Sequence, residues 1–242
     1  MFAIAKIHEK MGHPKATKDA YQNYINGGGN DPEKVVESLF KIADIEEKLA
    51  HHTEAEKGYR RTIGAAKNFE DAGKPAGQVW AAEAKFRLTE HTYEDLVAVR
   101  IPANPKRQAE ALKDKIGLLT KLGKQLADVI KYNEGNMVIA ALTKLGQANQ
   151  HMAKAIKGAP LPKDLNKDEL AAYTKQLESV YKPFDDQAVQ NFTGAINKSY
   201  EINFYNKWTK IALDAMARYQ PEKYAEPAEI AIPVAFTDDS GS

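Results

Sequence analysis

The sequence contains no cysteine among its 242 residues. This absence excludes disulfide bonds, thiolate catalysis and cysteine-based zinc sites. Long apolar runs are also missing, since no stretch approaches the roughly 18 residues that suggest a membrane span. The opening segment 1–10 is amphipathic and lacks a signal-peptide core. We therefore expect a soluble chain without direct membrane insertion, periplasmic or envelope-associated if an export signal has been removed and otherwise cytoplasmic.

The sequence also lacks a strong excess of positive or negative charge. The chain has 34 Lys and Arg against 33 Asp and Glu, and the two signs are interspersed. Nucleic acids and acidic membranes are bound by concentrated positive charge, so we expect no nucleic-acid partner. The apolar fraction of 43% is enough for a packed core under a well-solvated surface, which argues against disorder for most of the chain.

Strand-like alternation is nearly absent, whereas signals for helices are frequent. Asp31-Pro32-Glu33 is typical of an N-cap followed by proline at the first helical position, and Asn104-Pro105 repeats the pattern. Between 108 and 131, apolar residues recur at steps of three and four, which predicts one apolar stripe along a helix. That stripe comprises Leu112, Ile116, Leu119, Leu122, Leu126 and Val129. A similar stripe from Met137 to Ile156 predicts the second helix of a hairpin.

We therefore predict an all-α fold. The expected helices are 2–11, 14–25, 32–50, 53–70, 78–98, 105–132, 136–157, 167–181 and 185–219, the last one divided in two. Residues 1–230 are expected to form a single domain, with possible sub-boundaries near 99–105 and at a 158–166 linker. Residues 231–242 are expected to be an extended or disordered tail.

A helix-pair repeat of about 34 residues is present in degraded form. In segment 35–66, Ile42 and Ala43 are followed by Ala50 at the turn and then by Ala55, Tyr59 and Thr62. Shorter matches contain Ala5, Gly12, Thr17 and Tyr21 near the start, and Ala188, Phe192, Ala195 and Trp208 near the end. This pattern resembles the tetratricopeptide repeat (TPR), although Glu46 stands where that family prefers a tyrosine. The resemblance implies a right-handed superhelical solenoid of antiparallel helix pairs, with longer helices in the middle.

A second resemblance concerns the segment from Ala82 to Pro227. It carries Ala-Pro-Leu-Pro-Lys-Asp-Leu at 159–165, Tyr173, Leu177 and Tyr-Asn-Lys-Trp-Thr at 205–209. The segment looks like the carboxy-terminal portion of large TPR proteins of bacterial envelopes, including those of gliding-motility machines. This resemblance implies a role in assemblies at the periplasm or envelope.

Patterns that would indicate catalysis or metal binding have simpler explanations in this sequence. His51 and His52 are adjacent, so on a helix they point about 100° apart and do not chelate readily. Metal-binding histidines on a helix usually stand at i and i+4, and no His-x-x-x-His occurs. Gly27–Gly29 lacks the Lys-Ser/Thr of a phosphate-binding loop. We therefore expect no catalytic residue, no cofactor and no metal, and hence not an enzyme.

The repeat register places four residues on the helix face that would line a concave groove: Glu37, Phe40, Asp44 and Glu47. Grooves of this kind bind an extended or helical peptide. An acidic groove would suit a basic peptide. Seven of the 11 tyrosines mostly fall at helix-pair packing positions and are interpreted first as core residues, although exposed ones would favour partner binding. These are Tyr21, Tyr24, Tyr59, Tyr173, Tyr181, Tyr200 and Tyr205.

The expected function is therefore a non-catalytic scaffold for protein–protein interaction, as one module of a larger bacterial envelope-associated protein. The partner is expected to be a protein or peptide, and the sequence leaves its identity and the oligomeric state open. Two alternatives also remain open. An RNA-binding helical-repeat protein would need a basic groove. A helical enzyme with a site between the long helices of 106–156 would need polar residues buried in the bundle core.

Overall fold

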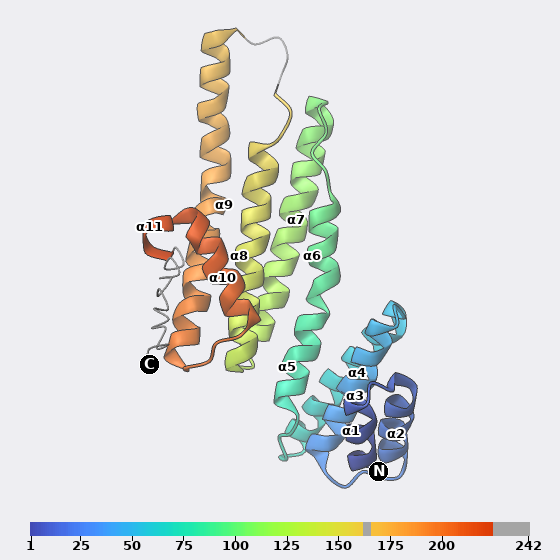
Figure 1. The fold of residues 1–242 in the computed structure, drawn as a ribbon. Coiled ribbons are helices and arrows are strands. Elements are labelled where there is room, and N and C mark those ends of the chain that lie inside the picture. Colours follow the sequence, from blue (N-terminus) through green and yellow to red (C-terminus); the bar gives the residue numbers. More distant parts are fainter. Residues whose placement is uncertain (162–165, 225–242) are drawn as a thin grey trace, which may run out of the picture.

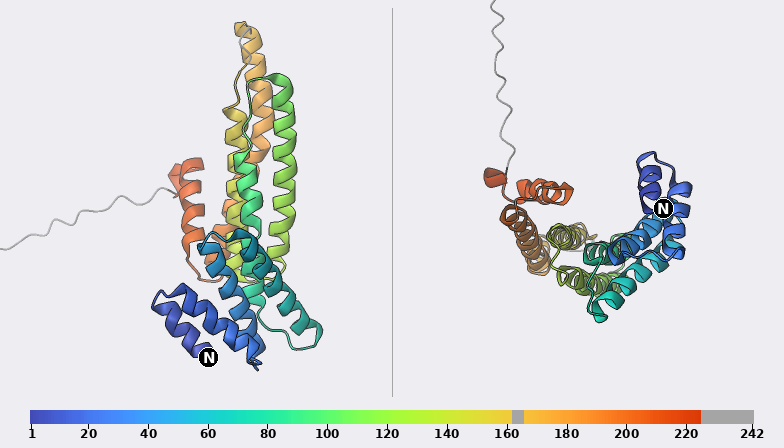
Figure 2. Two further views of the ribbon diagram at one scale, coloured as in Figure 1. Left: turned by 90° about the vertical axis from the view of Figure 1, so that its right-hand side faces the viewer. Right: turned by 90° about the horizontal axis from the view of Figure 1, so that it is seen from below.

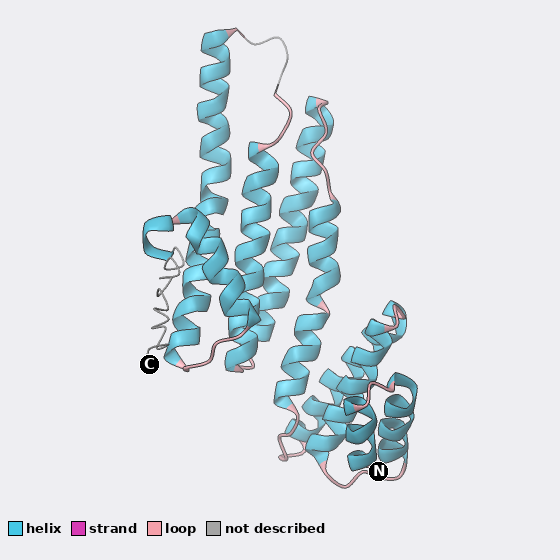
Figure 3. Cartoon of the chain, in the orientation of Figure 1, coloured by secondary structure: helices cyan, strands magenta, loops and turns pink. Residues whose placement is uncertain are grey.

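The structure is a computed structural model, and it describes residues 1–161 and 166–224. All regular structure in these residues is helical, which confirms the predicted all-α class (Figures 1 and 3). The helices are α1 (Phe2–Lys10), α2 (Pro14–Asn26), α3 (Pro32–Lys48), α4 (His52–Asp71), α5 (Gln78–Arg87), α6 (Thr89–Ala98), α7 (Pro105–Ile130), α8 (Gly135–Lys157), α9 (Lys167–Glu201), α10 (Lys207–Tyr219) and α11 (Pro221–Tyr224). The predicted tail 231–242 and residues 162–165 of the predicted 158–166 linker lie outside the described residues.

Both predicted helix caps are present. The Asp31 side chain accepts hydrogen bonds from the backbone N–H groups of Glu33 and Lys34, at 3.1 and 3.4 Å. Asn104 accepts one from the backbone N–H of Arg107 at 3.2 Å. These bonds satisfy N–H groups that have no partner within the first helical turn, which explains why α3 and α7 begin where they do.

The predicted break between residues 181 and 185 is wrong. α9 runs without interruption through 35 residues and contains Pro183. A proline inside a helix removes one backbone hydrogen bond and crowds the preceding turn. The side chain of Pro183 is exposed, and the part of α9 that follows it buries Ala188 and Phe192, so packing compensates for the lost bond. The expected division of 185–219 does occur, before the cap that Asn206 provides for α10.

The helices alternate between two layers. α3 contacts α5, α5 contacts α8, and α8 contacts α10, so these four helices form one layer. α4, α7 and α9 pack behind them: α4 on α3 and α5, α7 on α5 and α8, and α9 on α8 and α10. Seen end-on, the helices follow an open arc with α1 and α10 toward its two ends (Figure 2). α5 and α6 form one nearly continuous column that bends at Leu88 (Figure 1).

Small residues allow α3 and α4 to approach closely. Ala43 of α3 is fully buried and packs with Phe40, Ala55 and Tyr59. A methyl group at Gly58 of α4 would lie only 2.6 Å from the Cβ of Ala43, closer than two carbon atoms can approach. The pattern of small and aromatic residues found in the sequence therefore forms the contact between these two helices.

We expect opposite effects from the same substitution at two glycines of α4. In Gly58→Ala, overpacking against Ala43 costs about 1 to 3 kcal/mol, which exceeds the gain of about 0.5 to 1 kcal/mol from replacing a helical glycine. Gly64 has open space around its Cα, so Gly64→Ala should raise the unfolding free energy by about 0.5 to 1 kcal/mol. Urea denaturation of both variants measures the difference. Equal stabilisation by both substitutions would contradict the close approach at Gly58.

Candidate functional site

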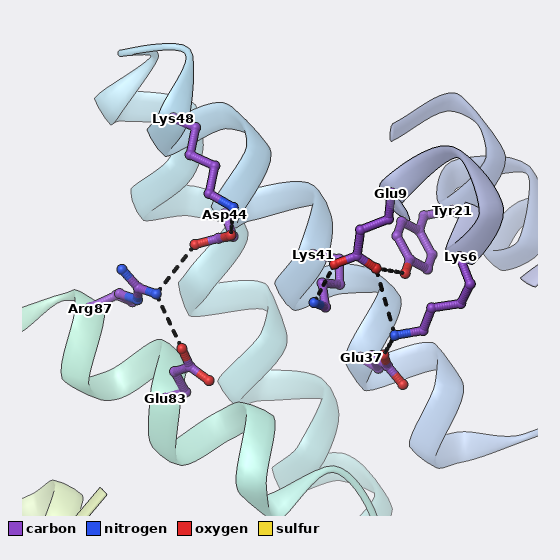
Figure 4. Close-up of polar contacts among 9 residues, drawn as sticks. All are labelled: Lys6, Glu9, Tyr21, Glu37, Lys41, Asp44, Lys48, Glu83 and Arg87. Carbon is purple, nitrogen blue, oxygen red and sulfur yellow. Dashed lines mark hydrogen bonds and ion pairs between the residues drawn. The ribbon is translucent and has the colours of Figure 1, made fainter. Parts of the chain in front are cut away.

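Charged side chains from three helices gather on one side of the N-terminal half (Figure 4). On α3, Glu37, Lys41, Asp44 and Lys48 follow one another at steps of three and four, which places them on one helix face. Lys6 and Glu9 of α1 and Glu83 and Arg87 of α5 complete the group, which we call the charged face. It thus combines residues that are distant in sequence.

Glu9 links α1 to α3 within the charged face. Its Oε1 accepts a hydrogen bond from Lys41 Nζ at 2.5 Å, and its Oε2 accepts one from the Tyr21 hydroxyl at 2.9 Å. Lys6, one turn earlier, forms an ion pair with Glu37. Burial by itself raises the pKa of Glu9, but the hydrogen bonds from Lys41 and Tyr21 outweigh it, so the pKa lies below its usual range. The carboxylate is therefore held in its charged form.

Asp44 links α3 to α5. Its Oδ1 lies 3.5 Å from Arg87 Nη2, and its Oδ2 lies 2.7 Å from Lys48 Nζ. Arg87 also reaches Glu83 Oε1 at 3.2 Å, so its guanidinium stands between two carboxylates (Figure 4). Arg87 thereby fixes the position of α5 against α3 by charge as well as by packing.

The structure brings together two of the four residues predicted for the groove. Glu37 and Asp44 lie on the charged face. Phe40 is buried instead, with its ring centroid 5.8 Å from that of Tyr59 and 5.3 Å from that of Trp80. Glu47 lies outside this group, with its Oε1 3.0 Å from His52 Nδ1. Phe40 differs because it shares the core-facing side of α3 with Ala43.

The acids of the predicted groove all have cationic or imidazole partners within the chain. Glu37 pairs with Lys6, Asp44 with Lys48 and Arg87, and Glu47 with His52. A basic peptide would have to displace these partners, so the face is one of mixed charge rather than an acidic one. Sequence reasoning missed Lys41 and Arg87, although the four-residue spacing of Glu37 to Lys41 and of Glu83 to Arg87 signals charged helix faces.

Two pockets open beside the charged face. One, of about 200 Å³, lies between α1, α2 and α3, and its lining includes Glu9, Tyr21, Lys41 and Asp44. The other, of about 300 Å³, lies between α5, α6, α8 and α10. Its lining includes Glu83, Arg87, Glu90, Phe204, Lys207 and Trp208. The ion pair between Asp44 and Arg87 joins a residue of the first pocket to a residue of the second.

A buried lysine contacts two of the residues that line the second pocket, Glu90 and Trp208. Lys144 of α8 is buried, with its Nζ 2.9 Å from Glu90 Oε2 and 4.4 Å from the centroid of the Tyr93 ring. The Trp208 ring lies 5.3 Å from the same ammonium group on another side. A cation enclosed by a carboxylate and two aromatic faces is held firmly. Lys144 therefore fixes α6, α8 and α10 relative to one another.

A buried polar pair lies among the long middle helices. Lys115 of α7 is 1% exposed, and its Nζ donates to the Leu96 carbonyl at 2.6 Å and lies 2.9 Å from His151 Nε2. Burial lowers the pKa of Lys115 and of His151. Ile116 belongs to the predicted apolar stripe but is 44% exposed, and Lys115 turns inward instead to cap the last turn of α6. Helix capping accounts for this pair, because its ammonium group is enclosed and already bonded.

The tyrosines divide between core and surface. Tyr21 and Tyr59 are buried, as expected for helix-pair packing. Tyr200 and Tyr205, which flank the turn between α9 and α10, are each 63% exposed. Tyr200 and Tyr205 therefore offer contact area to a partner. The sequence pattern alone does not distinguish such exposed tyrosines from those of the core.

The chain matches no protein-family model, and no curated protein or solved structure is significantly similar to it. The resemblance to TPR proteins therefore stays a prediction. In the part of the chain that the structure describes, none of the helices has the length and apolarity needed to cross a bilayer.

We expect Tyr21→Phe and Tyr59→Phe to differ in stability. The Tyr21 hydroxyl donates to Glu9, so its removal should lower the unfolding free energy by about 1 kcal/mol at neutral pH. The Tyr59 hydroxyl is buried without a hydrogen-bond partner among the described residues, so Tyr59→Phe should be neutral or slightly stabilising.

The Tyr21→Phe effect should depend on pH. Because the pKa of Glu9 is lowered in the folded state, its contribution is present above the ordinary carboxyl pKa and is lost as pH falls through the folded value. The deficit of Tyr21→Phe should therefore shrink in acid. Denaturation of both variants and the wild type at pH 7 and pH 3 measures it. A deficit of the same size at both pH values would contradict the role of the Glu9 carboxylate.

Proposed function

We propose that this chain is a non-catalytic protein-interaction module with a TPR-like solenoid fold, and that it binds an extended segment of a partner protein along the charged face. The observation that carries the proposal is the ion pair between Asp44, which lines the first pocket, and Arg87, which lines the second. A peptide lying along α1, α3 and α5 would place successive side chains in these pockets. Grooves of helical repeats recognise peptides in this manner.

The arrangement of layers supports this proposal. In the TPR-like interpretation, α1, α3, α5, α8 and α10 are the first helices of successive pairs, and such helices line the concave side of the solenoid. The charged side chains come from α1, α3 and α5, as this interpretation requires. Their ion pairs hold them in place before binding, which reduces the entropy lost on association.

The partner segment inferred from these charges differs from a purely basic peptide. Each acid of the predicted groove already has a partner in the chain. A cation of the partner segment would therefore replace an existing ion pair, and the net gain in binding free energy would be small. In a segment with both acidic and basic residues, the basic residues can pair with the acids of the charged face while the acidic residues pair with the released lysines and arginines. No partly buried charge is then left without a partner. We therefore infer a partner segment of mixed charge.

A second surface supports membership in a larger assembly. Ile4, Ile7 and Met11 stand three or four residues apart on and just after α1, and they are 51%, 56% and 58% exposed. Contiguous exposed apolar side chains of this kind commonly mark protein contacts. Together with the resemblance of 159–165 and 205–209 to envelope TPR proteins, this stripe supports a module of a bacterial envelope-associated protein.

Photo-crosslinking from two matched lysines tests the proposal. Lys48 lines the first pocket and pairs with Asp44, whereas Lys67 pairs with Asp71 on the exposed side of α4. A photoreactive amino acid at position 48 should capture a defined protein from envelope or soluble extracts of the source cells, and the same residue at position 67 should not. Nuclease treatment should leave the product unchanged. Capture of the same proteins from both positions would contradict binding at the charged face.

Arginine substitutions then locate the energetic centre of the contact. We expect Arg87→Ala to weaken binding of the captured partner at least about tenfold, since arginines at the centre of an interface often dominate affinity. Arg60→Ala is the matched control, because Arg60 also pairs with a glutamate four residues away but belongs to α4. Equal affinity of the two variants, measured by calorimetry with circular dichroism as the folding control, would remove Arg87 from the site.

A further inference from the structure

Two histidines and a glutamate from three helices meet outside the charged face. Glu47 lies in the last turn of α3, His52 begins α4, and His91 belongs to α6. One ligand atom from each residue lies within 4.8 Å of the other two. The Nδ1 of His52 lies 3.0 Å from Glu47 Oε1, and the rings of His52 and His91 stand at 87° with centroids 5.8 Å apart.

We propose that Glu47, His52 and His91 bind a divalent transition-metal ion of the zinc type. Two imidazole nitrogens and one carboxylate oxygen are a donor set that Zn²⁺ and its first-row neighbours prefer, whereas Ca²⁺ and Mg²⁺ prefer oxygen alone. Three protein ligands leave a fourth position for water. The proposal is independent of the partner segment at the charged face.

The distances fit a site that closes around the ion. Metal–ligand bonds of about 2.0 to 2.2 Å in a tetrahedron separate ligand atoms by roughly 3.3 Å. Glu47 and His52 are already near this separation. The imidazoles of His52 and His91 are partly solvent-exposed and not locked in the core, so a rotation of His91 brings its nitrogen into range.

A carboxylate behind His91 supports its role as a ligand. Glu94 Oε2 lies 3.6 Å from His91 Nδ1, one helical turn away on α6. This separation is longer than a hydrogen bond, so Glu94 supplies negative charge near the ring without fixing its orientation. The bound ion would tie the turn between α3 and α4 to α6, so that three helices share one cross-link.

The sequence pattern gave no indication of this site, for a physical reason. Histidines that chelate from one helix show the i, i+4 spacing, but here the second imidazole comes from a different helix. The neighbouring His51 serves as a natural control. Its Nδ1 lies 2.7 Å from Glu46 Oε2, which is the same kind of contact as that of His52 with Glu47, and Glu46 is also bound by Lys18.

Isothermal titration of the untagged full chain with ZnCl₂ tests the proposal. We expect one Zn²⁺ per chain with a dissociation constant on the order of micromolar, as suits a partly exposed site of three ligands. His52→Ala and His91→Ala should each weaken binding at least about tenfold, and His51→Ala should leave it unchanged. An excess of Mg²⁺ should not compete.

Three results would overturn the proposal: no saturable binding by the wild type, unchanged binding by His52→Ala and His91→Ala, or an equal loss in His51→Ala. Circular dichroism of each variant establishes that it is folded. If an alanine variant fails to fold, Glu47→Gln and His91→Gln remove ligand strength while keeping a polar side chain of similar length. Unchanged affinity in these two variants would likewise overturn the site.

Discussion

The close approach of neighbouring helices is the constraint on which this structure depends. At Gly58 and Ala43, α4 and α3 come so near that no added methyl group fits between them. At Gly146 of α8, the missing side chain leaves the space that the ring of Phe192 of α9 occupies. A small residue on one helix thus leaves space that the neighbouring helix or one of its side chains fills. In the charged face, long side chains bridge the wider gaps: lysine and arginine of α1, α3 and α5 reach carboxylates on a neighbouring helix.

Features that depend on neighbouring residues could be predicted from the sequence. The starts of α3 and α7 follow from Asp31 and Asn104, which bond to N–H groups within the next turn. The continuity of α9 could not, because local rules end a helix near Pro183 and only the packing of α9 on α8 shows that the lost hydrogen bond is compensated. The exposure of Ile116 could not be predicted for a similar reason, because the neighbouring Lys115 turns inward to cap α6, which is a tertiary contact.

The same distinction between local and tertiary features applies to the candidate site. Helical spacing placed Glu37 and Asp44 on one face of α3, and the structure agrees. The same spacing did not separate Phe40 from them, because a position at the boundary of a helix face is assigned by its neighbours in space. Arg87 could not be paired with Asp44 from sequence at all, since the two residues lie on different helices. For a site formed by several helices, the sequence thus reveals only the regular spacing of charged residues on each helix, and not how they pair.

Each ion pair of the charged face contributes little to the free energy of unfolding, although the face contains several of them. Exposed pairs are worth about 0 to 1 kcal/mol, and partly buried ones gain little more once desolvation is included. Apolar residues at the same positions would hold α1, α3 and α5 together at least as well, as Phe40 and Ala43 do on the opposite side of α3. Paired charges beside two pockets differ from an apolar contact in one respect, because they remain available for exchange with the charges of a partner. Stability alone therefore accounts poorly for this face, and its paired charges beside two pockets are the reason that we propose it as the binding surface for a segment of mixed charge.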